Sequence, residues 1–139
     1  MAIPEDGAQR AWHFKQLRWS LQSLATAGSD QPTLFPDHVA RPDDLAFDYD
    51  HWASVIRSEY EAELSRAEVD ALAAIDQKLA TMTRDGAEFD AELWTEAALT
   101  SSEHWADVRR LATLALEAFG WSVEKAPEIS GDRGTAIVQ

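Results

Sequence analysis

The sequence predicts an all-α protein, a four- to five-helix bundle, and three observations lead to this fold class. Apolar residues recur at intervals of three and four over most of the chain, which is the period of an amphipathic helix. No stretch alternates apolar and polar residues as a half-buried strand does. The 139 residues, 45% of them hydrophobic, suit one core. We expect one helical domain over residues 1–121 and a flexible tail over residues 122–139.

The first helix is expected over residues 8–27, with Gly28 as the glycine that ends it. Its core stripe consists of four residues that fall within one arc of the helix: Phe14, Leu17, Leu21 and Leu24. Trp12 and Trp19 lie almost opposite this stripe. A helix that is apolar on two sides is either covered twice within its own domain or offers one face to a partner. The Trp12/Trp19 face is therefore a candidate homodimer or partner surface.

A long connection is expected over residues 29–47, which hold three prolines and five large apolar residues. Unstructured connections of this length are uncommon inside compact domains. The apolar content predicts that this segment is an ordered strap, and the Trp12/Trp19 face is the surface that we expect it to cover.

The middle helices have start signals of different strength. The second helix is expected to begin with Asp48 or Asp50 as its N-cap and to continue to Leu64. The third begins at Ser65, which forms an S-x-x-E capping box with Glu68. Its apolar stripe consists of Val69, Leu72, Leu79 and Met82, with Ile75 beside it.

Two further helices are expected in the last third of the domain. The run 84–86, Arg-Asp-Gly, breaks the helical pattern, and a short helix is expected at about 90–99. A second capped start at residues 100–103 opens the last helix. Gly120 followed by Trp121 predicts a Schellman ending, in which the indole packs back on the last turn.

The acidic charge of the chain is concentrated in its middle. The formal net charge is −13. Residues 29–64 hold nine acidic and two basic residues, and residues 65–99 hold eight acidic and three basic residues. This charge repels nucleic acid and anionic membranes and attracts basic partners. The same acidic surface is also explained by solubility alone.

Several classes of site lack their sequence signatures. There is no cysteine, which excludes disulfides and thiolate chemistry and favours a reducing, cytoplasmic location. The N-terminus has no secretory pattern, and no apolar run reaches the length of a membrane span. The glycines form neither a phosphate loop nor a dinucleotide fingerprint, and the catalytic motifs of serine hydrolases and zinc proteases are absent. We therefore expect no cofactor.

A metal site has little support in the sequence. Asp48 and His51 have the i, i+3 spacing that could direct both side chains toward one ion. A helical dimetal site would also need Glu-x-x-His pairs, and the chain has none. A capping aspartate and a surface histidine explain the pair equally well, so we expect no metal.

The candidate partner-binding residues are acidic and aromatic. Four aspartates lie within eight residues, with Phe47, Tyr49 and Trp52 among them or close by: Asp43, Asp44, Asp48 and Asp50. Charge accelerates encounter with a basic surface, and aromatic anchors supply buried contact. Helix capping is the structural alternative for the aspartates. Glu59 and Glu63 extend the acidic character, or stand on a solvated face.

Asp76 interrupts the apolar arc of the third helix. Burial of an unpaired carboxylate is costly, so we expect a partner for it. Arg109, beside the apolar arc of the last helix, is the candidate. A functional carboxylate is the alternative.

Together these features predict a non-enzymatic acidic helical module that binds a basic protein. An inhibitor or immunity-type protein that neutralises its partner belongs to this class. The alternative is a small helical enzyme or ligand-binding bundle that uses the carboxylates of Asp76, Glu59 and Glu63.

Overall fold

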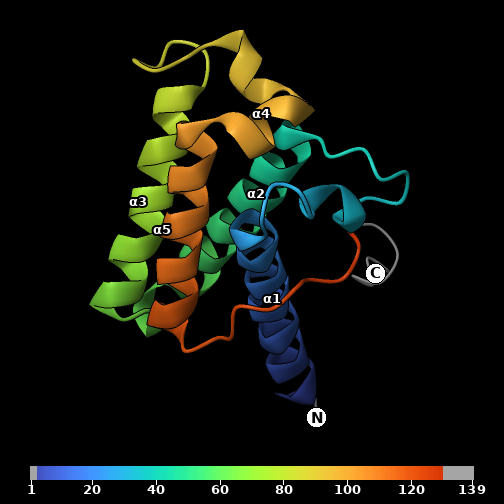
Figure 1. Ribbon diagram of the computed structural model, residues 1–139. Helices are drawn as coiled ribbons and strands as arrows, with labels where there is room; N and C mark the ends of the chain where they lie inside the picture. The colour runs from blue at the N-terminus through green and yellow to red at the C-terminus, as the bar shows by residue number, and fades with distance from the viewer. Residues whose placement is uncertain (1–2, 130–139) are drawn as a thin grey trace.

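The computed structural model describes residues 3–129 and confirms the all-α bundle (Figure 1). Its four long helices are α1 (Ile3–Ala25), α2 (Pro42–Tyr60), α3 (Arg66–Met82) and α5 (Glu103–Phe119). The short helix α4 (Glu96–Ser101) precedes α5. Three 3-10 turns complete the connections: η1 (Gln31–Leu34), η2 (Glu61–Glu63) and η3 (Ala91–Trp94). Between residues 3 and 129, none of the helices combines the length and apolarity needed to cross a membrane.

The helices are packed in a chain of neighbours rather than in a closed ring. Helix α1 packs against both α2 and α5, and α3 packs against α5. Helices α2 and α3, although joined by the short turn η2, contact each other much less. Helices α2 and α3 are therefore the two ends of this series of neighbours.

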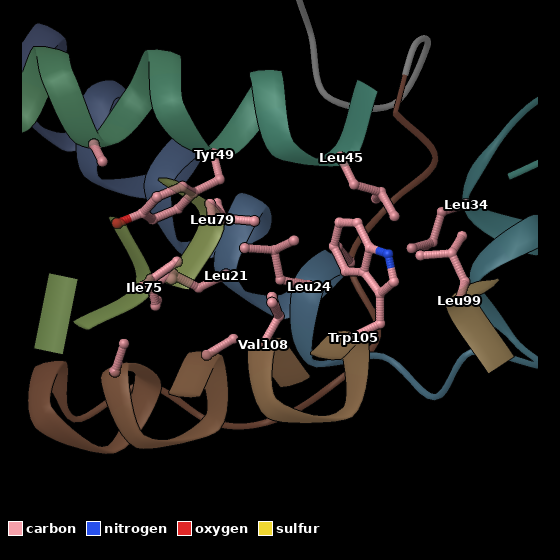
Figure 2. Packing of buried hydrophobic residues seen from close by; sticks show 14 of the residues in the cluster. Leu21, Leu24, Leu34, Leu45, Tyr49, Ile75, Leu79, Leu99, Trp105 and Val108 are labelled. Carbon is pink, nitrogen blue, oxygen red and sulfur yellow. The ribbon is translucent and has the colours of Figure 1, made fainter. Parts of the chain in front are cut away.

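The core is centred on Trp105, which is 1% exposed. Its indole lies among Leu34, Leu45 and Leu99, which come from η1, α2 and α4 (Figure 2). The indole N–H donates a hydrogen bond to the Leu93 carbonyl oxygen at 2.6 Å. A buried tryptophan needs such an acceptor, so this one residue fixes the turn before α4 on the end of the bundle.

Most of the expected capping signals are confirmed. Ser65 accepts a hydrogen bond from the Glu68 N–H at 3.1 Å, and Glu68 accepts one from the Ser65 N–H at 2.9 Å. Ser102 caps α5. Gly120 has a left-handed φ of 74°, and the Trp121 N–H donates to the Leu116 carbonyl oxygen as a Schellman ending requires. The helix expected at 90–99 is divided into η3 and α4, because Thr95 caps a new helix within it.

The ends of α1 differ from those expected. The helix begins at Ile3 rather than Ala8, because a proline in the first turn needs no hydrogen-bond partner for its nitrogen. It ends at Ala25. Gly28 is not a left-handed cap, since Gly120 is the only glycine with positive φ among the residues described. A Cβ at Gly28 would instead overlap the Leu99 carbonyl group and the Thr100 backbone. The prediction that Gly28 ends the helix was therefore wrong, and the glycine is needed instead for this close approach of the chain.

The start of α2 corrects a second prediction. The helix begins at Pro42 with Arg41 as N-cap, so Asp48 and Asp50 lie inside it and cap nothing. Proline at the first helical position is already set to the helical φ. The connection between α1 and α2 is correspondingly shorter than the expected 29–47.

The strap that remains is ordered, as expected, but it lies at the C-terminal end of α1. Leu34 and Phe35 are fully buried in the core, and the Gln31 side chain donates to the Ser23 carbonyl oxygen at 3.1 Å. Ser23 is eleven residues from Trp12, roughly 16 Å along the helix axis. The strap is anchored far from Trp12.

The segment after α5 lies across α1 as far as it is described (Figure 1). The Gln22 side chain donates to the Ser122 carbonyl oxygen at 3.0 Å, and the Ile129 N–H donates to the Leu34 carbonyl oxygen at 2.7 Å. Ala126 is buried between these two contacts along the chain. Residues 122–129 of the expected tail are therefore held on the bundle; residues 130–139, with the apolar run 136–138, lie outside the described residues.

Replacement of Gly28 by alanine should lower the free energy of unfolding by about 2 kcal/mol, because the new methyl group overpacks the contact with the chain at Leu99. Gly7→Ala is the matched control. Gly7 lies within α1, and a Cβ there has no neighbour within 4 Å. It should therefore raise the free energy of unfolding by about 0.5–1 kcal/mol. Urea denaturation of both variants measures the two effects, and a neutral Gly28→Ala would contradict the close approach.

Candidate binding groove

A groove of about 790 Å³ lies between α2, α3 and the segment that follows α3. It occupies the weakly packed side of the bundle, at the N-terminal half of α2 and the C-terminal half of α3. It is lined by twelve residues: Asp43, Ala46, Phe47, Asp50, Asp76, Leu79, Ala80, Thr83, Arg84, Phe89, Ala91 and Trp94.

The interior of the groove is mainly apolar. Ala46, Leu79 and Ala80 are small or aliphatic, and the aromatic rings of Phe47 and Phe89 stand at its sides. Phe47 is 72% exposed and Phe89 is 41% exposed. Large apolar side chains gathered in one concave place mark a surface that a ligand or partner covers.

Trp94 forms a rigid part of the groove wall. Its indole N–H donates to the Met82 carbonyl oxygen at 2.9 Å. Its ring meets that of Trp105 edge to face, with 5.4 Å between the ring centroids. Because the ring is held by a hydrogen bond on one side and by the core tryptophan on another, its position is set before anything binds.

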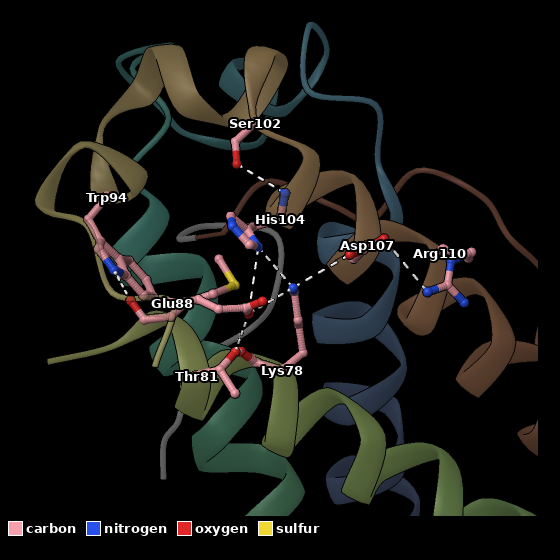
Figure 3. A network of polar contacts seen from close by, with 9 residues as sticks. Lys78, Thr81, Glu88, Trp94, Ser102, His104, Asp107 and Arg110 are labelled. Carbon is pink, nitrogen blue, oxygen red and sulfur yellow. Dashed lines mark hydrogen bonds and ion pairs between the residues drawn. The ribbon is translucent and has the colours of Figure 1, made fainter. Parts of the chain in front are cut away.

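A polar network attaches the segment after α3 to the helices (Figure 3). Thr81 donates to the Glu88 carboxylate at 2.7 Å, and the Lys78 ammonium group donates to the same oxygen at 3.1 Å. Lys78 also lies 2.9 Å from His104 Nδ1 and 3.5 Å from Asp107 of α5. The hydrogen bonds from Thr81 and Lys78 lower the pKa of Glu88. The network thereby holds the residue next to Phe89 in place.

The end of the groove nearest the η2 connection is closed by a contact between α2 and α3. Tyr49 donates to Asp76 Oδ1 at 2.9 Å, and Arg57 lies 2.7 Å from Asp76 Oδ2. Asp76 thus has a partner, as expected, but the partner is not Arg109. The Arg109 guanidinium donates to the Leu99 carbonyl oxygen, and burial lowers its pKa. Burial raises the pKa of Tyr49, which remains a hydrogen-bond donor.

The four expected aspartates do not form one surface. Asp43 and Asp50 line the groove on either side of Phe47. Asp44 faces Arg41, at 2.9 Å, and Asp48 accepts a hydrogen bond from Ser20 of α1 at 2.9 Å. Tyr49 and Trp52, named with them from the sequence, are respectively buried in the core and packed at its edge.

Arg84 is the basic residue of the groove. It is exposed and forms no ion pair with any residue between 3 and 129. It follows α3, whereas Asp43 and Asp50 lie on α2. The groove therefore has two acidic groups on one wall, and on the other the basic Arg84 together with Asp76, which is paired with Arg57.

The remaining expected site residues lie outside the groove lining. Glu63 is exposed and forms an ion pair with Arg10 at 2.6 Å, and Glu59 is exposed on α2. Trp12 and Trp19 are half-buried, and Trp19 packs against the core with the Lys15 ammonium group 5.4 Å from its ring centre.

A second polar and aromatic cluster joins α1 to the C-terminal half of α2. His13 Nδ1 lies 2.9 Å from the Tyr60 hydroxyl, and the imidazole also neighbours the rings of Trp52 and Tyr60. Burial lowers the pKa of His13, partly opposed by Glu59. This cluster is a packing contact between two helices.

No group of three or more histidine, aspartate or glutamate side chains is arranged to bind a metal ion in residues 3–129. Comparison with protein families, with curated sequences and with solved structures found no match to this chain.

Sequence reasoning found one wall of the groove and missed the other. Asp43, Asp50 and Phe47 were visible as an acidic and aromatic cluster. The second wall includes Phe89 and Trp94, in and beside a region for which the sequence predicted only a short helix. These two aromatic residues, five positions apart, were the available signal.

Tyr49→Phe should lower the free energy of unfolding by about 1–2 kcal/mol, because it removes the only hydroxyl that the structure places on Asp76 Oδ1 and the Leu72 carbonyl oxygen. Thermal or urea unfolding measures the effect. The Tyr49→Phe/Asp76→Asn double variant completes a cycle. Additive losses from Tyr49→Phe and Asp76→Asn would contradict the coupling between the two residues.

Acidification should destabilise the protein through His13. Because burial lowers its pKa from 6.5, the unfolded chain takes up a proton first as pH falls below about 6.5. The free energy of unfolding therefore decreases as the pH falls below about 6.5, and it is retained above that pH. His13→Gln should reduce the loss between pH 7.5 and 5.5 in chemical denaturation, whereas His38→Asn, at an exposed residue with positive φ, should leave it unchanged. Equal pH dependence in all three proteins would refute this role.

Proposed function

We propose that this chain is a non-enzymatic protein-binding module that holds a basic segment of a partner protein in the groove between α2 and α3. The observation that carries this proposal is the combination of an apolar interior, an exposed Phe47 and the paired acidic groups of Asp43 and Asp50 in one concavity.

The energetics of such a groove favour a macromolecular partner. Burial of a phenylalanine side chain contributes about 1.5–3 kcal/mol, and Phe47 has most of its surface still to bury. The formal charge of −13 accelerates encounter with a basic protein over several ångströms. Apolar contact then supplies the affinity, while the acidic groups supply the preference for basic residues.

Neutralisation of a basic partner, as by an inhibitor or immunity-type protein, is the specific form of binding that we propose. When the groove holds the basic segment of the partner protein, that segment can no longer bind the partner's own anionic ligands. Binding in the groove would therefore inhibit the partner. The absence of cysteine from the sequence suits action in a reducing cytoplasm.

An enzyme that uses Asp76, Glu59 and Glu63 has less support. The three carboxylates do not share a site, since Asp76 lines the groove and the two glutamates do not. Each oxygen of Asp76 already faces a donor, Tyr49 or Arg57. A carboxylate held in this way links the two helices.

Two groove variants test the proposal: Phe47→Ser, and Asp43→Asn with Asp50→Asn. The partner to be tested is a basic protein that the wild-type chain binds at about 0.1 M salt and binds more weakly at about 0.5 M salt. The Phe47→Ser variant should no longer bind it. With the double aspartate variant its binding should weaken at low salt, where screening is least. Retention on beads and the affinity of the purified pair are the measurements.

The matched controls carry equal changes outside the groove. Leu114→Ser changes another large apolar residue, which is 47% exposed on α5. Asp44→Asn with Asp70→Asn removes the same number of charges from exposed positions on α2 and α3. Binding that survives both groove variants, or that fails equally with the controls, would refute the groove as the binding surface.

A further inference from the structure

We propose that the groove receives an amphipathic α-helix, with an apolar face, two basic residues two turns apart on one flank and an acidic residue on the other. This inference rests on the function proposed above and specifies the partner segment that the groove recognises.

The chemistry of the groove favours a helix over an extended segment. An extended peptide brings unpaired backbone N–H and C=O groups, which lose free energy when they are buried without partners. Peptides bound in this way usually add a strand to a sheet edge, and residues 3–129 contain no strand. The interior of the groove, with Ala46, Leu79 and Ala80, offers apolar side chains instead. A helix satisfies its own backbone and presents only side chains.

The length of the groove matches about two turns of a helix. Asp43 and Asp50 are seven residues apart on α2, or about 10.5 Å along its axis. On the other wall the lining runs from Asp76 to Ala80 on α3 and continues to Thr83, just after the helix ends. A helix between two helices buries residues at i, i+3 or i+4, and i+7. The bound helix would pack against both α2 and α3, which contact each other little.

The charges on the two walls specify how that helix is turned about its axis. The i, i+7 spacing of Asp43 and Asp50 is complementary to basic residues at i and i+7 of the partner. Arg84 on the opposite wall has no ion-pair partner among residues 3–129 and is complementary to an acidic residue. Asp76 is already paired with Arg57 and contributes little to this preference.

Two occupants from the chain itself fit the groove less well. Residues 130–139 hold one basic residue, Arg133, and one acidic residue, so they lack the two basic residues that the groove requires. A second copy brings a further net charge of −13. On α1, its most basic helix, Arg10 is already paired with Glu63 and Lys15 lies over Trp19. A different protein with a basic amphipathic helix is the better match.

Synthetic peptides provide the probe. The first is a peptide of about 18 residues, long enough to be helical, with leucines on one face, lysines at i and i+7 on one flank and a glutamate on the other. A second has the same composition in an order that disperses the leucines around the helix. A third carries a central proline, which breaks the helix. Calorimetry measures affinity, and circular dichroism measures the helix formed on binding.

The first peptide should bind and gain helicity, and the other two should bind at least about tenfold more weakly, because the face or the helix is lost. Asp43→Asn with Asp50→Asn should weaken the first peptide about threefold to tenfold at low salt. Asp44→Asn with Asp70→Asn should change its affinity less than about twofold, since neither residue lines the groove. Arg84→Glu should weaken the binding of the first peptide, and replacement of the peptide's glutamate by lysine should restore that binding.

Equal binding of the helical and proline peptides would overturn the helical occupant, while loss of that binding with Phe47→Ser would leave the proposed function standing. If the groove variants changed neither peptide binding nor capture of the partner protein, both proposals would fail. Sedimentation at two protein concentrations tests the second copy: a mass that rises with concentration in the wild type but not in Phe47→Ser would assign the groove to self-association and overturn the partner helix.

Discussion

The contact of Tyr49 and Arg57 with Asp76 is the interaction on which the groove depends. Helix α2 packs on α1, α1 on α5 and α5 on α3, so α2 and α3 are the two ends of this series, and this contact is a polar link between them. It lies between the η2 connection and the groove. The three groups satisfy one another, so the link costs little desolvation. Beyond it the mainly apolar groove lies between the two helices.

The hydrophobic core fixes the position of the groove wall that holds Trp94 and Phe89. Trp105 is buried against α1, α2 and η1, and its indole anchors the turn before α4. Trp94 packs edge to face on Trp105, so one groove wall is an extension of the core. Glu88, bound by Thr81 and Lys78, fixes the chain beside Phe89. Walls that are ordered in advance lower the entropy lost on binding, which suits recognition by a groove that keeps its shape.

Three of the local capping signals were read correctly from the sequence, whereas the caps expected at Gly28 and at Asp48 or Asp50 were wrong. The packing of one helix on another was not predicted. The capping box at Ser65 and the Schellman turn at Gly120 involve residues within a few positions of each other, so their spacing is sufficient. Asp76 was recognised as unusual, but its partner depends on which neighbouring helix its side chain faces. Although α3 packs mainly on α5, which carries Arg109, Asp76 faces Arg57 of α2. The second groove wall was missed for the same reason: Trp94 belongs to it only because Met82 and Trp105 orient its ring.

The acidic cluster illustrates why proximity in sequence is a poor guide to a binding surface. Four aspartates within eight residues must point around the circumference of a helix with 3.6 residues per turn. Asp44 and Asp48 consequently face Arg41 and Ser20, where they stabilise the fold. Asp43 and Asp50, two turns apart, are left on the groove face with Phe47 between them. The recognition that we propose therefore depends on a spacing of seven residues on a helix, and not on the number of charges in the chain.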